Sequence, residues 1–247
     1  MLYGLIGYPL GHSFSEKYFT SKFKNEGIDA TYSLFPLPSI DDLPDLLKSH
    51  KDLKGFNVTI PYKQEVMDYI DILSEDASEI GAVNVVKINE GVGDTDKYLC
   101  GYNTDYIGFT ESLRPLLTDE MKKALILGTG GASKAVAYSL DRLGIDYKFV
   151  SRVPGEDELG YDELSKEIMS ESLLIVNTTP LGMFPKTENA PDIPYNLLGP
   201  AHLCYDLVYN PEITEFMKRS ANAGAKVKNG LEMLHLQAEA AWKIWNE

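Results

Sequence analysis

A short apolar run that leads into a glycine-rich turn constrains the fold of this chain more than any other segment. Residues 124–127 are apolar, Gly128-Thr129-Gly130 follows at once, and an amphipathic helical pattern extends over residues 131–143. A strand, a glycine turn and a helix in this order are the context that a dinucleotide-binding βαβ unit requires. An ordinary strand-to-helix turn is the alternative, and the flanking pattern favours the nucleotide site.

The residues of this turn have separate parts in holding a pyrophosphate. Gly128 permits the tight turn, and Gly130 leaves room for the phosphates to approach the backbone. The helix that begins at Gly131 presents free N–H groups and the positive end of its dipole. Ser133 stands where the usual pattern has a third glycine. The predicted contacts of the turn with a dinucleotide are Gly128, Thr129, Gly130, Gly131 and Ala132.

The end of the next strand indicates which dinucleotide binds. An NAD site has an acidic residue about 20 residues after the turn, which bonds the ribose 2′-hydroxyl. Here the strand ends in Ser151-Arg152, and the planar guanidinium of Arg152 suits a 2′-phosphate. The lack of an acidic residue at the end of this strand and the presence of Arg152 therefore favour NADP. A solvated surface cation is the alternative for Arg152, and the loop that follows carries Glu156, Asp157 and Glu158.

The rest of the chain alternates short apolar runs with helical patterns. Strands are expected at residues 2–6, 31–35, 54–58, 147–150, 173–177 and 203–207, and a hairpin at 83–88 and 97–101 with its turn around 91–96. Helices are expected at residues 14–24, 40–48, 105–117, 161–169 and 231–245, and helical turns from 62 to 79. This alternation indicates the α/β class, with a parallel sheet wrapped by helices.

Two α/β domains account for these elements. The glycine turn belongs to a Rossmann-like dinucleotide-binding domain over residues 105–227. A substrate-binding and catalytic domain takes residues 1–104 together with 228–247, because the second block is complete without the last helix. We therefore expect the C-terminal helix to return to the first domain.

The charge of the chain excludes two classes of partner. Its 37 acidic and 23 basic residues give a net charge of −14, which opposes binding to nucleic acid or to an anionic membrane surface. No apolar stretch is long enough to span a bilayer, and the N-terminal residues lack the pattern of a signal peptide. Cys100 and Cys204 form no metal-ligand spacing and no disulfide framework. We expect a cytoplasmic protein with no metal.

Three polar pairs, each two residues apart, mark the first domain. Because residues i and i+2 of an extended chain point to the same side, each pair presents two hydrogen-bonding groups to one place. Helix capping and turn chemistry are the alternative, and this alternative suits a pair that precedes a helix better than one that ends an apolar strand. The pairs are Ser13 and Ser15, Asn57 and Thr59, and Asn103 and Asp105.

Two further polar residues stand in unusual places. Lys63 is predicted at the start of a helix, where a cation opposes the helix dipole, and such local conflicts are typical of functional positions. A lysine beside a carboxylate can act as a general acid or base, although an exposed lysine is the common case. Gln237 shares a helical stripe with Met233 and Ala241. A buried amide needs partners, either a polyol ligand or a backbone group.

Eight motifs follow one another along nearly the whole chain, and together they resemble the shikimate dehydrogenase family. In the first half they are Gly7-Tyr8-Pro9-Leu10-Gly11-His12-Ser13-Phe14-Ser15, Gly55-Phe56-Asn57-Val58-Thr59-Ile60-Pro61-Tyr62-Lys63, Gly81-Ala82-Val83-Asn84 and Gly101-Tyr102-Asn103-Thr104-Asp105. In the second half they are the glycine turn, Asn177-Thr178-Thr179-Pro180-Leu181-Gly182-Met183, Asp206-Leu207-Val208-Tyr209-Asn210-Pro211 and Gly230-Leu231-Glu232-Met233-Leu234-His235-Leu236-Gln237.

The resemblance implies a role for each matching residue. It implies an NADP-dependent enzyme of chorismate and aromatic amino acid biosynthesis that interconverts 3-dehydroshikimate and shikimate, with Lys63 and Asp105 as its catalytic pair. The implied substrate contacts are Ser13, Ser15, Asn57, Thr59, Lys63, Asn84, Asp105, Tyr209 and Gln237. Beyond the glycine turn, the implied cofactor contacts are Ser151, Arg152, Thr178, Met183, Leu207, Gly230 and Met233. Small molecules are the only implied partners. The protein itself is expected to be a monomer or a homodimer.

The chain departs from the family pattern at a few positions. Glu16 follows the second serine, where proline is common, and Val153 stands where threonine is common. Phe19-Thr20 replaces a His-Asn pair. Two alternatives stay open at this point: a quinate/shikimate dehydrogenase with relaxed substrate or cofactor choice, and a dinucleotide-binding module without catalysis. The presence of both Lys63 and Asp105 argues against the second, and the paired serines argue against another dehydrogenase, such as a folate enzyme.

Overall fold

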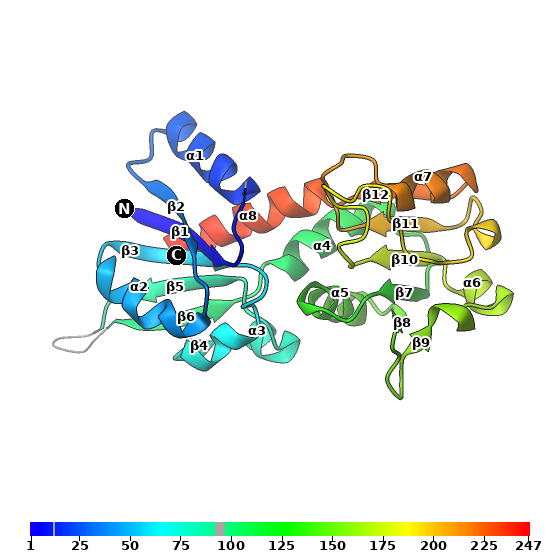
Figure 1. Ribbon diagram of the computed structural model, residues 1–247, viewed down its shortest axis with the longest axis horizontal. Coiled ribbons are helices and arrows are strands. Elements are labelled where there is room, and N and C mark those ends of the chain that lie inside the picture. Colours follow the sequence, from blue (N-terminus) through cyan, green and yellow to red (C-terminus); the bar gives the residue numbers. More distant parts are fainter. Residues whose placement is uncertain (12, 92–96) are drawn as a thin grey trace. The chain divides into compact units, whose positions relative to one another are not determined.

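The chain forms two compact units, each built on its own β-sheet. The computed structural model describes residues 1–11, 13–91 and 97–247 (Figure 1). Unit 1 comprises Met1–Thr104 and Ala238–Glu247, and unit 2 comprises Asp105–Gln237. His12 of the first motif and the predicted hairpin turn at 92–96 lie outside the described residues.

Unit 1 contains a six-stranded mixed sheet in the order β2-β1-β3-β5-β6-β4. Its strands are β1 (Leu2–Gly7), β2 (Thr31–Pro36), β3 (Leu53–Val58), β4 (Ile72–Leu73), β5 (Val85–Asn89) and β6 (Tyr98–Tyr102). Strands β2, β1 and β3 are parallel, whereas β5 is antiparallel to both β3 and β6. The carboxyl ends of β1 and β3 therefore lie at the same edge as the amino end of β5.

Two apolar clusters cover the two faces of this sheet. One contains Phe19 and Phe23 of α1 (Phe14–Glu26) and Ala241 and Trp245 of α8 (Leu231–Asn246). The other contains Leu43 of α2 (Leu43–Ser49), with η1 (Ile40–Asp42), η2 (Glu65–Tyr69) and α3 (Glu75–Ile80) on the same side. Figure 1 shows α1 on the opposite side of the sheet from α2 and α3.

The C-terminal helix is fixed to unit 1 by its last tryptophan. The Trp245 ring stacks on Tyr3 with ring centroids 4.8 Å apart, and its Nε1 donates to the Val86 carbonyl at 3.0 Å. A Cβ on Gly55 would overlap the indole, so this strand position requires glycine. The predicted return of the last helix to the first block is confirmed for Ala238–Glu247.

Unit 2 contains a six-stranded, entirely parallel sheet in the order β12-β11-β10-β7-β8-β9. Its strands are β7 (Lys123–Leu127), β8 (Asp146–Ser151), β9 (Leu159–Gly160), β10 (Leu174–Asn177), β11 (Leu203–Asp206) and β12 (Lys226–Asn229). The chain leaves β7 toward β8 on one side and returns to β10 on the other. In open α/β sheets, ligands bind at the carboxyl ends of the strands at this reversal of strand order.

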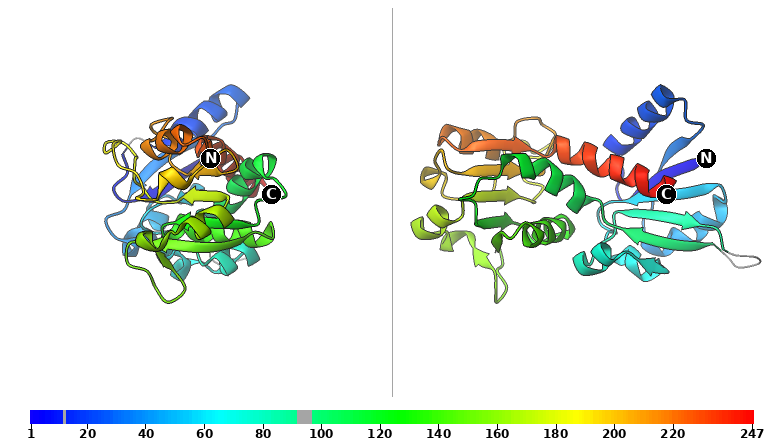
Figure 2. Two further views of the ribbon diagram at one scale, coloured as in Figure 1. Left: turned by 90° about the vertical axis from the view of Figure 1, so that its right-hand side faces the viewer. Right: turned by 180° about the vertical axis from the view of Figure 1, so that it is seen from behind.

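Helices cover both faces of the second sheet. One apolar cluster joins the sheet to α4 (Asp105–Leu113) and α5 (Gly131–Arg142), and another joins it to α6 (Lys166–Glu171) and α7 (Glu215–Asn222). Short 3₁₀ turns lie at η3 (Arg114–Leu116), η4 (Tyr161–Glu163) and η5 (Tyr195–Leu197). The first part of α8 runs beside α4 (Figure 2), where a Cβ on Gly108 would overlap the Met233 carbonyl oxygen. Glycine at this position therefore permits the close helix approach.

The α/β class, the two sheets and the antiparallel strands of the hairpin are confirmed. Three strands are absent from the sequence prediction, namely β4, β9 and β12. The first two have only two residues each, and β12 is an edge strand with one apolar side chain, so they show little periodicity. The helix predicted from 105 to 117 ends at Leu113, and a 3₁₀ turn that contains Pro115 follows it, because proline disfavours the interior of an α-helix.

Candidate active site

Hydrogen bonds join several predicted substrate residues of unit 1 to one another. The Tyr32 hydroxyl donates to Asn57 Oδ1 at 2.7 Å and also hydrogen-bonds with the Ser15 side chain. Asn57 Nδ2 donates to the Asn84 carbonyl at 3.3 Å. Ser15, Asn57 and Asn84 therefore gather at one edge of the sheet, where β1 and β3 end and β5 begins. Burial raises the pKa of the Tyr32 hydroxyl well above its usual range, so it stays a neutral donor.

Tyr32 is a member of this group that sequence analysis missed. It lies in β2, in the run Thr31-Tyr32-Ser33-Leu34-Phe35, where a tyrosine is a common strand residue. Its ring stacks on Phe19 with centroids 4.8 Å apart, so the ring belongs to the core and only its hydroxyl reaches the polar group. No local pattern reveals this role, because its partners come from α1 and β3.

The Asn84 side chain binds Thr104, the residue directly before Asp105. Asn84 Oδ1 accepts the Thr104 N–H at 2.7 Å, and Asn84 Nδ2 donates to Thr104 Oγ1 at 3.1 Å. Asn103 Nδ2 donates to the Ala82 carbonyl at 2.9 Å. The Asn103 side chain therefore binds a backbone group, as the alternative of turn chemistry expected for the pair of Asn103 and Asp105. Asp105 itself is buried and is the first residue of α4, where the helix dipole favours a carboxylate.

Lys63 lies in a turn that is tied to the same strand edge. Its carbonyl accepts the Val83 N–H at 2.7 Å, which places Lys63 beside the residue that precedes Asn84. The side chain is half-buried. The prediction that Lys63 begins a helix is wrong, because residues 61–64 form a turn and η2 begins at Glu65. Lys63 therefore does not oppose a helix dipole. The backbone hydrogen bond between Lys63 and Val83 fixes its position.

Ser13 and Thr59 are half-buried at the same end of the sheet. Ser13 occupies the N-cap position of α1, but within the described residues its side chain makes no capping hydrogen bond. Capping therefore does not explain a serine here. The Thr59 N–H donates to the Ile6 carbonyl at 3.0 Å, which carries the β3–β1 pairing one residue beyond β3.

The glycine turn of unit 2 has the conformation that a pyrophosphate site needs. Gly128 has φ +103°, which favours glycine, and its N–H donates to the Val150 carbonyl at 2.9 Å. Gly130 is the N-cap of α5, and no described atom lies within 4 Å of a Cβ placed on it. The α5 N-terminus is thus open to an anion, so these residues fit a dinucleotide phosphate.

Ser133 shows why a serine can replace the third glycine of the pattern. Its hydroxyl donates to the Gly130 carbonyl at 2.6 Å, inside the first turn of α5, and the residue is buried. The side chain is therefore small enough and fully satisfied by its own turn. Thr129, Gly131 and Ala132 complete the turn and are exposed or half-buried.

The end of β8 presents the predicted phosphate-recognition residues. Arg152 is exposed, and the Ser151 hydroxyl accepts the Val153 N–H at 3.3 Å, which shapes the turn after the strand. Glu158 accepts the Gly155 N–H at 3.1 Å. Glu158, one of the three acidic residues in the loop after β8, therefore forms a hydrogen bond within its own loop.

Three further predicted cofactor residues lie at the same carboxyl edge. The Thr178 hydroxyl donates to the Leu127 carbonyl at 2.7 Å, directly before Gly128. The Leu207 N–H donates to the Asn177 carbonyl at 2.9 Å. Gly230 packs so tightly on Leu207 that a Cβ there would overlap the Leu207 carbonyl oxygen. The loops after β7, β10 and β11 and the start of α8 therefore meet around the glycine turn.

The remaining predicted residues have mixed surroundings. Met183 is largely exposed, and burial raises the pKa of the Tyr209 hydroxyl, which keeps it protonated. Met233 packs into the apolar cluster beneath α4 and α5. Gln237 is buried, and its Nε2 donates to the Leu234 carbonyl at 3.1 Å, which is the backbone partner expected as an alternative.

Asp206 is a buried carboxylate at the carboxyl end of β11 that sequence analysis did not assign. Its side chain is 0 % exposed. Burial raises its pKa to about 6, and hydrogen bonds from Thr214, Val208 and Asn177 limit the shift. The group is therefore mainly ionised at neutral pH and takes up a proton in mildly acidic solution.

This raised pKa predicts a pH dependence of stability. Because the folded state binds the Asp206 proton more tightly than the unfolded chain, Asp206 favours folding more as the pH falls from about 6 toward 4. Relative to Asp206→Asn, which does not titrate, we expect the unfolding free energy of the native protein to rise by about 2–3 kcal/mol between pH 7 and pH 4. Urea denaturation of both proteins at each pH measures this, and a constant difference contradicts it.

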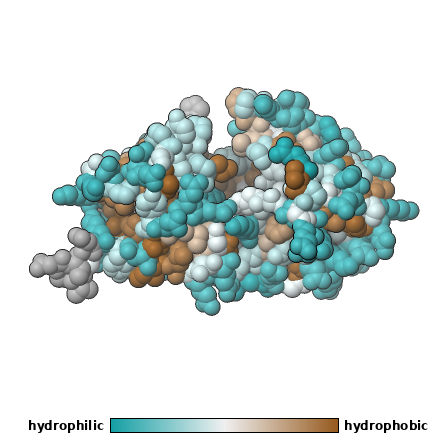
Figure 3. Space-filling model, turned by 60° about the horizontal axis from the view of Figure 1, so that its bottom comes forward, coloured by the Kyte–Doolittle hydropathy of each residue, from teal (hydrophilic) through white to brown (hydrophobic). Residues whose placement is uncertain are grey.

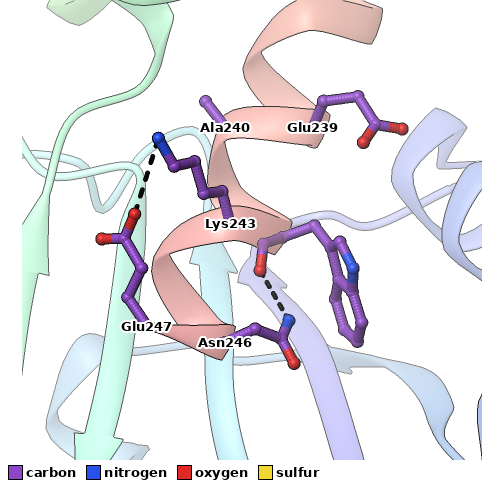
Figure 4. Close-up of a pocket in the computed structure, with 6 residues that line it drawn as sticks. Glu239, Ala240, Lys243, Asn246 and Glu247 are labelled. Atoms are coloured by element: carbon purple, nitrogen blue, oxygen red, sulfur yellow. Dashed lines mark hydrogen bonds and ion pairs between the residues drawn. The ribbon is translucent and has the colours of Figure 1, made fainter.

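The surface carries hydrophilic side chains (Figure 3) and a shallow pocket on the C-terminal segment. Figure 3 shows hydrophilic side chains over much of the face it draws. A shallow pocket in unit 1 is lined by Glu239, Ala240, Trp242, Lys243, Asn246 and Glu247 of the C-terminal segment (Figure 4). Its charges pair locally, with Lys243 Nζ 3.6 Å from Glu247 Oε1. Among the residues that the structure describes, no helix is long and apolar enough to cross a membrane.

Similarity to known proteins extends over the whole chain. Residues 5–86 match the model of the shikimate dehydrogenase substrate binding domain. The shikimate dehydrogenase (NADP(+)) of Clostridium beijerinckii is 41% identical over 99% of this chain and 92% of its own length. That of Caldicellulosiruptor saccharolyticus is 39% identical over 98% of this chain and 90% of its own length.

Solved structures of similar sequence have the same fold. The shikimate 5-dehydrogenase of Thermus thermophilus, solved in complex with NADP(H) and shikimate, is 31% identical to this chain. It superposes with a TM-score of 0.86 and covers 99% of this chain and 93% of its own. The two-sheet architecture is therefore shared with an enzyme whose structure holds both ligands.

Proposed function

The chain belongs to the shikimate dehydrogenase family, and we propose that it reduces 3-dehydroshikimate to shikimate reversibly, with Lys63 and Asp105 as its catalytic pair. NADP is its cofactor. The observation that carries the proposal is the hydrogen-bonded group of Ser15, Asn57 and Asn84 beside Lys63. This group lies in the segment that matches a substrate-binding domain.

The polar residues of unit 1 suit a small hydroxylated ring acid. Ser13 and Ser15 bring two hydroxyl donors to the start of α1, where a substrate carboxylate gains hydrogen bonds and the favourable end of the helix dipole. Asn57, Thr59 and Asn84 offer amide and hydroxyl groups for ring hydroxyls. A site built to hydrogen-bond hydroxyl groups rejects analogues without them, because its buried polar groups would be left unpaired. Tyr209 and Gln237, which belong to unit 2, are the other proposed substrate contacts.

Lys63 acts as the proton donor in the reducing direction. The bound dinucleotide supplies the hydride. Negative charge then develops on the substrate carbonyl oxygen, and the Lys63 ammonium delivers a proton to that oxygen. Asp105 orients the lysine and holds a neighbouring substrate hydroxyl. In the oxidising direction, neutral Lys63 takes the proton back.

The residues of unit 2 hold the dinucleotide by separate means. Gly128 and Gly130 bring the backbone to the pyrophosphate, with Thr129, Gly131 and Ala132 around it. Ser151 and Arg152 bind the 2′-phosphate, and Arg152 contributes a planar, permanently charged group. The nicotinamide end lies against Thr178, Met183, Leu207, Gly230 and Met233. Residues 1–104 with 228–247 are accordingly the proposed substrate domain, and residues 105–227 the proposed cofactor domain.

Replacing Arg152 separates recognition of the phosphate from recognition of the rest of the dinucleotide. We expect Arg152→Ala to raise the Kd of NADP about tenfold or more and to leave that of NAD nearly unchanged, because only NADP carries the 2′-phosphate. Arg142→Ala, which removes an exposed arginine at the end of α5, is the matched control. Equal weakening of NADP and NAD binding removes the proposed role of Arg152.

A panel of oxidation assays tests the proposed substrate. The purified protein is given shikimate or quinate, each with NADP or NAD, and steady-state rates are compared. We expect the highest kcat/KM for shikimate with NADP. A comparable kcat/KM for quinate contradicts the assignment. Sedimentation of the same preparation determines whether the protein is a monomer or a homodimer. Fractionation of cells tests its proposed cytoplasmic location.

A further inference from the structure

The proposed reaction does not use the buried carboxylate of Asp206, yet three donors converge on it. Asn177 Nδ2 donates to Asp206 Oδ1 at 2.9 Å, and the Val208 N–H donates to the same oxygen at 3.0 Å. The Thr214 hydroxyl donates to Oδ2 at 2.5 Å. Both carboxylate oxygens are therefore satisfied inside the fold, by groups from β10, from the loop after β11 and from the start of α7.

The hydrogen bonds continue from Asn177 into the loop after β10. Asn177 Oδ1 accepts both the Thr179 N–H at 3.1 Å and the Thr179 hydroxyl at 2.7 Å. Thr179 Oγ1 in turn accepts the Leu181 N–H at 3.3 Å. Asn177 thus uses its amide nitrogen on Asp206 and its amide oxygen on Thr179, which fixes the orientation of the loop relative to the carboxylate.

On its other side the carboxylate fixes the loop after β11. The Val208 N–H that it accepts lies one residue after Leu207, whose carbonyl faces Gly230. Thr214 is the N-cap of α7, where its Oγ1 also accepts the Met217 N–H at 3.3 Å. One buried charge therefore connects the two loops that carry Thr178, Met183 and Leu207.

Burying a charge at this position costs free energy of folding. An ionised group loses its hydration on burial, and apolar residues of similar volume often stabilise a core as well or better. The raised pKa of Asp206 shows that cost. What a carboxylate offers, and an apolar residue does not, is two acceptors of fixed direction for groups on separate loops.

We propose that Asp206 is a positioning residue for the dinucleotide: its carboxylate, through Asn177 and Val208, sets the two loops that contact the nicotinamide end of the cofactor. This inference rests on the proposed function, which places Thr178, Met183 and Leu207 against the cofactor. It assigns Asp206 no contact with substrate or cofactor. Its effect should therefore fall on cofactor affinity more than on substrate affinity.

Asp206→Ala leaves the three donors without their acceptor and is expected to raise the Kd and the KM for NADPH about tenfold or more. Asp206→Asn should restore both constants to within about threefold of native. Its amide oxygen still accepts from Asn177 and Val208, and its NH₂ group can donate to Thr214. Tyr205→Phe is the matched control: it removes the hydrogen bond at 2.7 Å between the adjacent Tyr205 and Ser112 but none of the three hydrogen bonds to Asp206.

The outcomes separate this proposal from the proposed function. If the native protein oxidises NADPH with 3-dehydroshikimate, but Asp206→Ala binds NADPH as tightly as Tyr205→Phe does, the positioning role is overturned and the enzyme assignment stands. If the native protein binds NADPH without turnover, the enzyme assignment fails, and the ratio of Kd values still decides the role of Asp206. An equal loss of NADPH affinity in Asp206→Asn and Asp206→Ala also overturns the proposal.

A second variant tests the connection if Asp206→Ala does not fold. Thr179→Val keeps the shape of the side chain but removes the hydroxyl that joins Asn177 to the Leu181 N–H. We expect the Kd of NADPH to rise about threefold to tenfold, with a smaller change in the substrate KM. An unchanged Kd for NADPH in this folded variant overturns the proposal.

Discussion

Replacing Lys63 with alanine is expected to lower kcat by about two to four orders of magnitude, the usual range for losing general acid–base catalysis. The substrate KM should change far less, because the proposed ground-state contacts of 3-dehydroshikimate come mainly from Ser13, Ser15 and Asn84. The effect should be large since hydride addition leaves charge on the carbonyl oxygen with no other proposed proton donor. Steady-state kinetics in both directions measures it.

Lys54→Ala is a suitable control for the loss of a lysine in unit 1. Lys54 lies on β3, and its Nζ forms an exposed ion pair with Glu90 at 2.9 Å. Pairs of this kind contribute little to stability, so we expect near-native kcat. If Lys63→Ala retains native kcat as well, Lys63 is not the proton carrier.

Replacing Gly230 with alanine should cause the second large loss, in cofactor binding. The added Cβ would overlap the Leu207 carbonyl oxygen and lie 2.7 Å from the carbonyl carbon. These are backbone atoms, so no change of rotamer relieves the overlap, and the start of α8 must move away from the loop after β11. We expect the Kd of NADP to rise about 10- to 100-fold, as an overpacked contact costs about 1–3 kcal/mol.

Gly199→Ala controls for the general effect of adding a methyl group to unit 2. No described atom lies within 4 Å of a Cβ on Gly199, and its φ lies outside the left-handed region. We expect native NADP affinity for this variant. Native affinity in Gly230→Ala would mean that the contact between Gly230 and Leu207 does not shape the cofactor site.

The sequence patterns predicted those parts of the fold that depend on residues close together in the sequence. The strand, glycine turn and helix at 124–143 depend on apolar periodicity and on the freedom of Gly128 at φ +103°. Edge strand β12 depends instead on pairing with β11, and its sequence Lys-Val-Lys-Asn has little preference for a strand. The position of Lys63 likewise depends on a hydrogen bond to Val83, and a helix-start pattern misplaced it.

The candidate site shows the same division. Pairs two residues apart indicated Ser13 and Ser15, and Asn57 and Thr59, because an extended backbone points both members to one side. Tyr32 and Asp206 carry no such signal. The hydrogen-bond partners of each lie on elements distant in sequence, so only the folded structure reveals these bonds.

The most direct test of the central claim is a single assay of NADPH oxidation by the purified protein with 3-dehydroshikimate as substrate. We predict turnover that depends on 3-dehydroshikimate, yields shikimate and NADP in equal amounts, and runs in reverse when shikimate and NADP are supplied. Tight binding of NADPH without any oxidation in the presence of 3-dehydroshikimate would contradict the claim, and would identify the chain as a dinucleotide-binding protein without this activity.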